Sequence, residues 1–273
     1  MATVQDRTPA ASAELSGREL RRVVALVLAA EGDRRVIAPL SVMIPGMTDA
    51  DGRQIRDATI RARVQGGDGI AALCADGRGE VLVVSESMLA GPELRVAPGE
   101  DELFVRALAG SRVPLDAVRR AADGDVVGPM RGEPVFGLVV TRRPFGAEAF
   151  SDADIVGVNG GILGVALCAL APAGGEEVTI LRDGAVVQNA RVPAGEAVWG
   201  AALAGCAEAV RSCAPLAERL MGAGSYFSHP LGEPVLALTM GDAVALRPGS
   251  AVGLDVSGGR VATVVCTTAQ NLT

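Results

Sequence analysis

The sequence predicts a mainly β protein made of tandem repeated small β-barrel or β-sandwich units with short helical insertions. Three observations predict it: a pattern that recurs at near-constant spacing, short apolar runs bounded by turn residues, and a core composition of small side chains. Apolar residues make up 49% of the 273 residues but aromatic residues only 3%. The core must therefore consist largely of Val, Leu, Ile and Ala, which suit layered β structure.

The recurring pattern is Val-x-Gly-Gly followed seven residues later by Cys. It occurs three times, at 64–67 with Cys74, at 158–161 with Cys168 and at 256–259 with Cys266. We interpret each Gly-Gly pair as a tight turn joining two strands. The apolar run that follows each pair is typical of a buried strand.

Two further segments match in the same order: residues 95–100 match 191–196, and residues 132–135 match 232–235. Collinear matches of this kind indicate an internal repeat. We therefore expect a flexible N-terminal arm, a divergent or shortened first repeat, a second repeat, and a third repeat with a C-terminal tail. Their bounds are 1–14, 15–74, 75–168 and 169–273.

Turn residues place hairpins in the last of these units. Asp183-Gly184 is expected to join strands at 177–181 and 185–189, and Gly241-Asp242 to join strands at 233–240 and 243–246. Residues 247–250 are expected to form a turn before a further strand.

Other segments leave helix and strand open. Ser16 and Glu19 have the spacing of a capping box, but the apolar residues 23–28 would serve equally as a strand. Pro39, before residues 40–44, falls near where Pro134 and Pro234 fall in their units, which supports a divergent first repeat. Residues 116–122 and 207–221 are the expected helical insertions.

Charge and composition exclude several classes of function. The net charge of −7 disfavours nucleic-acid binding, and all 25 basic residues are arginine, which excludes chemistry that needs a lysine. The N-terminus lacks the apolar region of a signal peptide, and residues 23–30 are too short to span a membrane. No CxxC is present and there is a single histidine, so we expect reduced core cysteines and no metal site.

No catalytic, cofactor-binding or metal-binding residue is assigned. His229 lies near Ser225 and Ser228, but neither serine is in a Gly-x-Ser-x-Gly elbow. Residues 157–162 lack the features of a phosphate loop, and residues 49–52 lack the downstream Glu of a calcium loop. The carboxylates in two clusters are interpreted as solvated loop charges: Glu100, Asp101, Glu102, Asp152 and Asp154. The aromatic residues Phe104 and Trp199 are interpreted as core packing or as an anchor at a subunit contact.

Several short motifs resemble the small β-barrel decoration, or head cement, proteins of tailed-bacteriophage capsids. They lie at 161–168, 171–180, 184–187 and 192–196, with Gly-Glu-Pro-Val at 132–135 and again at 232–235. The resemblance covers most of 160–270 and, more faintly, 69–168. The chain departs from it by its greater length and by inserted segments around 111–130 and 207–231.

The resemblance implies a structural virion protein that decorates and stabilises a phage capsid by binding its outer surface. It implies that the protein has no enzymatic activity and no cofactor, and that its partner is the major capsid protein. It also implies a homo-oligomer, with a trimer favoured, that is made in the host cytoplasm and located in the virion. Residues 1–14 would pair with capsid strands. The alternative is an enzyme of a repeat-built fold with a small-molecule site between repeats, near Arg63, Arg95 and Arg191.

Overall fold

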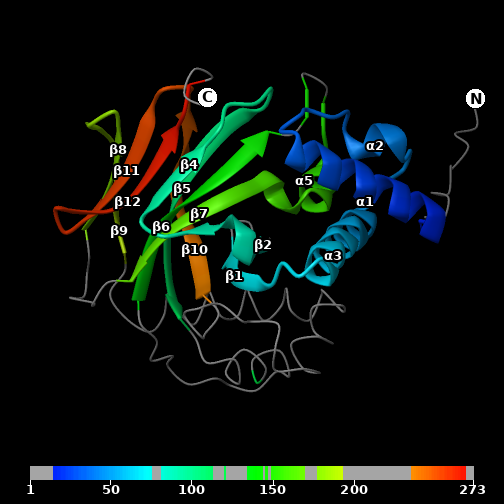
Figure 1. Ribbon diagram of the computed structural model, residues 1–273, viewed down its shortest axis with the longest axis horizontal. Coiled ribbons are helices and arrows are strands. Elements are labelled where there is room, and N and C mark those ends of the chain that lie inside the picture. Colours follow the sequence, from blue (N-terminus) through cyan, green and yellow to red (C-terminus); the bar gives the residue numbers. More distant parts are fainter. Residues whose placement is uncertain are drawn as a thin grey trace, which may run out of the picture.

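The computed structural model describes residues 15–75, 81–112, 120, 134–143, 145–146, 149–169, 177–192 and 235–268. Several features considered from the sequence lie outside these residues: the arm at 1–14, the segment 116–122 apart from Arg120, the segment 207–221, Cys206, Cys213, Trp199, Ser225, Ser228 and His229. Within the described residues the protein is mainly β, as predicted, with helices grouped at one end of the molecule (Figure 1).

Capping boxes begin three of the helices. The helices are α1 (Gly17–Gly32), α2 (Leu40–Met43), α3 (Asp49–Gln65) and α5 (Asp152–Gly157). Ser16 pairs with Glu19 at the start of α1, Thr48 with Asp51 at α3 and Ser151 with Asp154 at α5, each satisfying backbone N–H groups of the first turn. The capping box at Ser16 therefore marks a helix, and its apolar residues Val23 and Val27 are buried along one face.

A large mixed sheet forms the centre of the molecule. Its strand order is β2-β1-β10-β5-β6-β7-β3. The bounds are β1 (Ile70–Ala75), β2 (Val81–Ser85), β3 (Leu89–Ala90), β5 (Glu102–Arg112), β6 (Pro134–Arg143), β7 (Ile162–Ala169) and β10 (Val235–Leu246), with one-turn helices η1 (Glu86–Met88) and η2 (Asn159–Gly161) beside them. The sheet curls so that β2, at one edge, contacts β7 near the other.

A second sheet packs on the outside of this curl. Its order is β4-β12-β11-β8-β9, with β4 (Glu93–Val96), β8 (Glu177–Arg182), β9 (Ala185–Arg191), β11 (Ala251–Val256) and β12 (Gly259–Cys266). Leu138 and Val140 from β6 meet Ile180, Leu254 and Val264 from the second sheet in one aliphatic core. The inner face of the curl carries another such core, which includes Leu108, Val139 and Val165.

The local predictions had mixed outcomes. The hairpin at Asp183-Gly184 is confirmed between β8 and β9, and residues 247–250 form the expected turn. The hairpin at Gly241-Asp242 is wrong, because both flanking segments belong to β10, whose pairing with β5 shifts register there as a β-bulge. The residues after Pro39 form the short helix α2.

The three Val-x-Gly-Gly segments have different roles. At 64–67 and 158–161 the segment ends a helix, whereas at 256–259 it joins β11 to β12 in the expected turn. The apolar run after each one is a strand, as predicted. Strands of the expected units pair across their boundaries, β1 with β10 and β4 with β12. The described strands therefore do not separate into small barrels, and the division of the chain at 74 and 168 stays a prediction.

A turn of three left-handed residues joins α5 to β7. Asn159, Gly160 and Gly161 have φ angles of 53°, 64° and 67°. The Asn159 side chain accepts from the Val83 N–H (2.9 Å) and donates to the Val83 carbonyl (2.7 Å), which fastens the turn to β2. A Cβ at Gly161 would overlap the carbonyl oxygen of Arg142. This close approach explains why glycine is needed there.

The buried carboxylate of Asp154 ties α5 to α2. It accepts hydrogen bonds from the backbone N–H and the hydroxyl of Ser41 (2.7 and 2.8 Å) and of Ser151 (both 2.7 Å). Burial by itself would raise the pKa of Asp154, but these hydrogen bonds outweigh burial and the pKa is lowered. The interpretation of Asp154 as a solvated loop charge is wrong.

Replacing Gly161 with alanine should destabilise the fold by about 3 kcal/mol, because the new Cβ adds a clash to an unfavourable φ. Gly184→Ala is the matched control, since Gly184 also has a positive φ (84°) but its Cβ would meet no atom within 4 Å. The control should lose only about 1 kcal/mol. Urea unfolding of both variants measures the difference, and equal losses would contradict the close packing of the turn.

Replacing Asp154 with asparagine should cost about 2 kcal/mol at neutral pH, because a neutral amide cannot accept all four hydrogen bonds. The folded-state pKa lies below the ordinary 3.8, so the stability due to this carboxylate is complete above about pH 3.8 and is lost as pH falls further. The gap between wild type and Asp154→Asn should therefore close in acid. Asp33→Asn, at an exposed ion pair, should change little. A gap independent of pH would contradict this assignment.

Candidate functional site

A pocket of about 420 Å³ lies where the curled sheet meets the helices. This volume is within the range of small-molecule sites. Its walls come from α3, β2, β5, β6, α5 and the left-handed turn. The lining residues are Asp49, Arg56, Val81, Leu82, Arg106, Thr141, Phe150, Asp152, Ile155, Val156, Asn159 and Gly160.

Arg106 and Thr141 form the polar end of the sheet wall. Arg106 is paired with Val139 across β5 and β6, and Thr141 lies two residues beyond Val139 on β6. Both side chains therefore occupy the inner face of the curl as diagonal neighbours. Arg106 is half-buried and makes no hydrogen bond or ion pair within the described part of the chain. Its guanidinium is thus available to a ligand.

The other arginine of the pocket is already engaged. Arg56 of α3 is only 3% exposed, and its Nε donates to Asp57 at 3.1 Å. The two carboxylates that line the pocket, Asp49 and Asp152, are the first residues of α3 and α5. Acidic side chains at these positions favour the helix start. Arg106 is therefore the cation of the pocket that is best placed to bind an anion.

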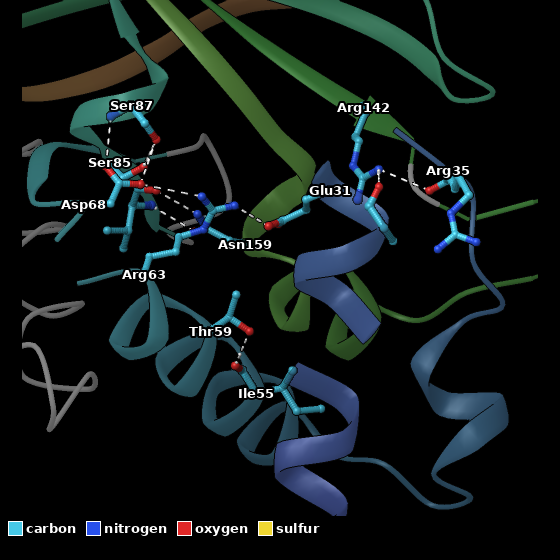
Figure 2. Close-up of polar contacts among 12 residues, drawn as sticks. Glu31, Arg35, Ile55, Thr59, Arg63, Asp68, Ser85, Ser87, Arg142 and Asn159 are labelled. Carbon is cyan, nitrogen blue, oxygen red and sulfur yellow. Dashed lines mark hydrogen bonds and ion pairs between the residues drawn. The ribbon is translucent and has the colours of Figure 1, made fainter. Parts of the chain in front are cut away.

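A chain of polar contacts runs beside the pocket (Figure 2). Asp68 accepts from the N–H and the hydroxyl of Ser87 (2.9 and 2.7 Å), and Arg63 lies between Asp68 and Glu31. Burial raises the pKa of Glu31, an effect that the charge of Arg63 opposes. Asn159 lines both the large pocket and a small neighbouring cavity of about 10 Å³, which has room for about one water molecule.

Arg142 is another buried charged residue, and its guanidinium lies near the end of α1. Its Nη1 donates to the carbonyl of Arg35 at 3.2 Å, as Figure 2 shows, and to the carbonyl of Ala30 at 3.1 Å. It also lies 3.6 Å from the carboxylate of Asp101. Burial lowers the pKa of Arg142. Asp101 also accepts two hydrogen bonds from Arg34 (3.1 and 2.7 Å). The interpretation of Asp101 as a solvated loop charge is wrong.

The arginines that the sequence suggested do not surround one cavity. Arg63 belongs to the polar chain beside the pocket. Arg95 is on β4, with a side chain 69% exposed, and Arg191 ends β9. Since β4 and β9 are opposite edges of the second sheet, these two side chains are far from a common site. The sequence analysis missed Arg56 and Arg106.

The described residues do not form a metal centre. Among them, no group of three or more His, Cys, Asp or Glu side chains could hold a metal ion. Cys74 and Cys266 are buried, and burial raises the pKa of the Cys266 thiol. In the same part of the chain, every helix is too short or too polar to cross a bilayer.

The fold is similar to that of 4-oxalocrotonate decarboxylase from Pseudomonas putida G7. The structure complexed with magnesium and adipate has a TM-score of 0.64 at 14% identity, covering 92% of this chain and 98% of that chain. The structure complexed with calcium and acetate has a TM-score of 0.62 at 16% identity, with the same coverage. Maleylpyruvate hydrolase from Sphingobium sp. SYK-6 gives a TM-score of 0.41 at 12% identity, over 81% of this chain and 86% of that chain. No family model and no curated protein sequence matches the chain.

The likeness to the two decarboxylase structures overturns the resemblance to phage decoration proteins, because both are structures of an enzyme. Four expectations depended on that resemblance and are therefore wrong: the decoration role, the capsid partner, the virion location and the absence of enzymatic activity. The trimer was inferred on the same basis and loses its support. Over nearly its whole length, the chain has the fold of 4-oxalocrotonate decarboxylase.

Proposed function

We propose that this protein is an enzyme that acts on a small organic acid bound in the pocket between the curled sheet and the helices. One observation carries the proposal: Arg106 presents a half-buried guanidinium, without a partner in the described residues, inside a pocket of about 420 Å³. The fold likeness to a decarboxylase supports it, since that protein was solved with the dicarboxylate adipate.

The pocket suits a ligand with a carboxylate at one end. The planar guanidinium of Arg106 would donate two parallel hydrogen bonds to the carboxylate oxygens. The hydroxyl of Thr141, on the same face of the sheet, would donate a third. A carboxylate held in this way would be fixed in orientation, which is what a positioned reaction needs.

The rest of the lining suits an apolar carbon chain. Leu82 from β2, Phe150 before α5, and Ile155 and Val156 from α5 provide apolar surface. Small-molecule sites combine such surface with a few polar groups that set orientation. A short carboxylic acid would therefore bind with its carboxylate at the sheet and its carbon chain against α5.

The position of the pocket also supports the alternative that the sequence left open. Asp49 and Arg56 belong to the first expected unit, 15–74, and the remaining lining residues belong to the second, 75–168. If these units are divergent copies of one ancestor, the site lies at their junction, as expected for an enzyme with a site between repeats.

Replacing Arg106 with glutamine should weaken adipate binding about tenfold or more, because the charged pair with the carboxylate is lost. Isothermal titration of the full chain measures the dissociation constant. Turnover of 4-oxalocrotonate and other small dicarboxylic 2-oxo acids, followed by absorbance and by carbon dioxide release, should fall in parallel.

Arg95→Gln is the matched control, since it removes an equal charge from an exposed strand outside the pocket. It should leave both binding and turnover unchanged. Equal effects of the two substitutions would contradict a specific role for Arg106. The absence of both adipate binding and turnover in the wild type would overturn the proposed function.

A further inference from the structure

The carboxylates of the pocket do not form the kind of site that a divalent cation needs. Magnesium and calcium take six or more oxygen ligands, commonly with several carboxylates. Among the described residues the lining provides two carboxylates, Asp49 and Asp152, each at the start of a different helix, and the same residues hold no metal-binding cluster elsewhere. The two similar decarboxylase structures were complexed with magnesium and with calcium. The described residues of this chain do not fit such an ion.

Within the described residues, the inner face of the curled sheet offers no cation ligand beyond this end either. Beyond Arg106 and Thr141, the same face continues into a buried aliphatic core that includes Leu108, Val135, Val139 and Val165. These side chains have no atom that can coordinate a cation. An ion placed against them would lose its hydration without compensation.

The sheet wall of the pocket provides a positive charge instead. Arg106 is a fixed cation there, whereas Arg56 on the helical wall already donates to Asp57, and the carboxylates of Asp49 and Asp152 lie at the starts of α3 and α5. A divalent cation beside Arg106 would be repelled, whereas an anion would be attracted. The guanidinium also has the fork geometry that matches a carboxylate, so it can bind the ligand without a bridging ion.

We infer that Arg106 binds the carboxylate of the ligand directly and that this binding needs no divalent cation. The inference rests on the proposed function and adds the mode of recognition to it. Arg106 and Thr141 together would provide the positive charge and the hydrogen bonds at the carboxylate end. Because the guanidinium itself supplies the positive charge, this anchor would not depend on a supply of metal.

Titration calorimetry with adipate tests the inference on the full chain. One sample is dialysed against EDTA, and a second sample contains excess magnesium chloride. The dissociation constants should agree within about twofold, and Arg106→Gln should weaken binding about tenfold in both samples. Magnesium chloride titrated alone should give no saturable heat of binding.

Two further variants keep the test valid if Arg106→Gln folds poorly. Arg106→Lys retains the positive charge but loses the planar guanidinium that can donate two parallel hydrogen bonds. This variant should bind adipate more weakly than wild type and more tightly than Arg106→Gln. Thr141→Val keeps the side-chain shape and removes the hydroxyl, and should weaken binding severalfold without any new dependence on magnesium.

The outcomes separate the inference from the proposed function. Adipate that binds only when magnesium is present would overturn the inference and leave the proposed function standing. The same holds if Arg106→Gln binds adipate as tightly as wild type while turnover persists. Adipate that binds in neither sample, with no turnover, would overturn the proposed function and the inference together.

Discussion

The carboxylate of Asp154 holds together the part of the molecule on which the pocket depends. It joins the first turns of α2 and α5 through Ser41 and Ser151, and it is fully buried. A buried charge is tolerable only where hydrogen bonds replace its water, and four do so here. Because α5 supplies Asp152, Ile155 and Val156 to the pocket, this one carboxylate fixes the helical wall opposite Arg106. The two hydrogen bonds from the Asn159 side chain to Val83 then fix the position of β2, which contributes another wall of the pocket.

Elements whose signal is local could be predicted from the sequence. The Asp183-Gly184 hairpin and the apolar runs of β1, β7 and β12 depend on neighbouring residues alone. The helix α3 was missed because its buried face includes Asp51, Arg56 and Thr59 rather than a clear apolar stripe. The bulge in β10 was mistaken for a hairpin because Gly-Asp suits both, and only the long-range pairing with β5 decides between them.

The candidate site was harder to predict, because its groups are brought together from distant parts of the chain. Asp154 and Ser41 are 113 residues apart, and Asp101 pairs with Arg34 across 67. Both carboxylates were therefore interpreted as solvated, because their partners are distant in the sequence and are brought near only by the fold. Arg106 did carry a local signal, since it alternates with Phe104 and Leu108 on one face of an apolar strand. A charge at such an inward position indicates a ligand or a buried partner.

The left-handed turn also decides how the pocket could be remodelled. A side chain at Gly160 would have to adopt a φ of 64° and would displace the side chain of Leu82, so substitution there strains the backbone. Ile155 and Phe150 contribute apolar surface without such a backbone constraint, and Phe150 already contacts Phe145 with ring centres 5.4 Å apart. Changes of ligand size, whether made by evolution or by protein engineering, should therefore accumulate on the helical side, while the turn stays as it is.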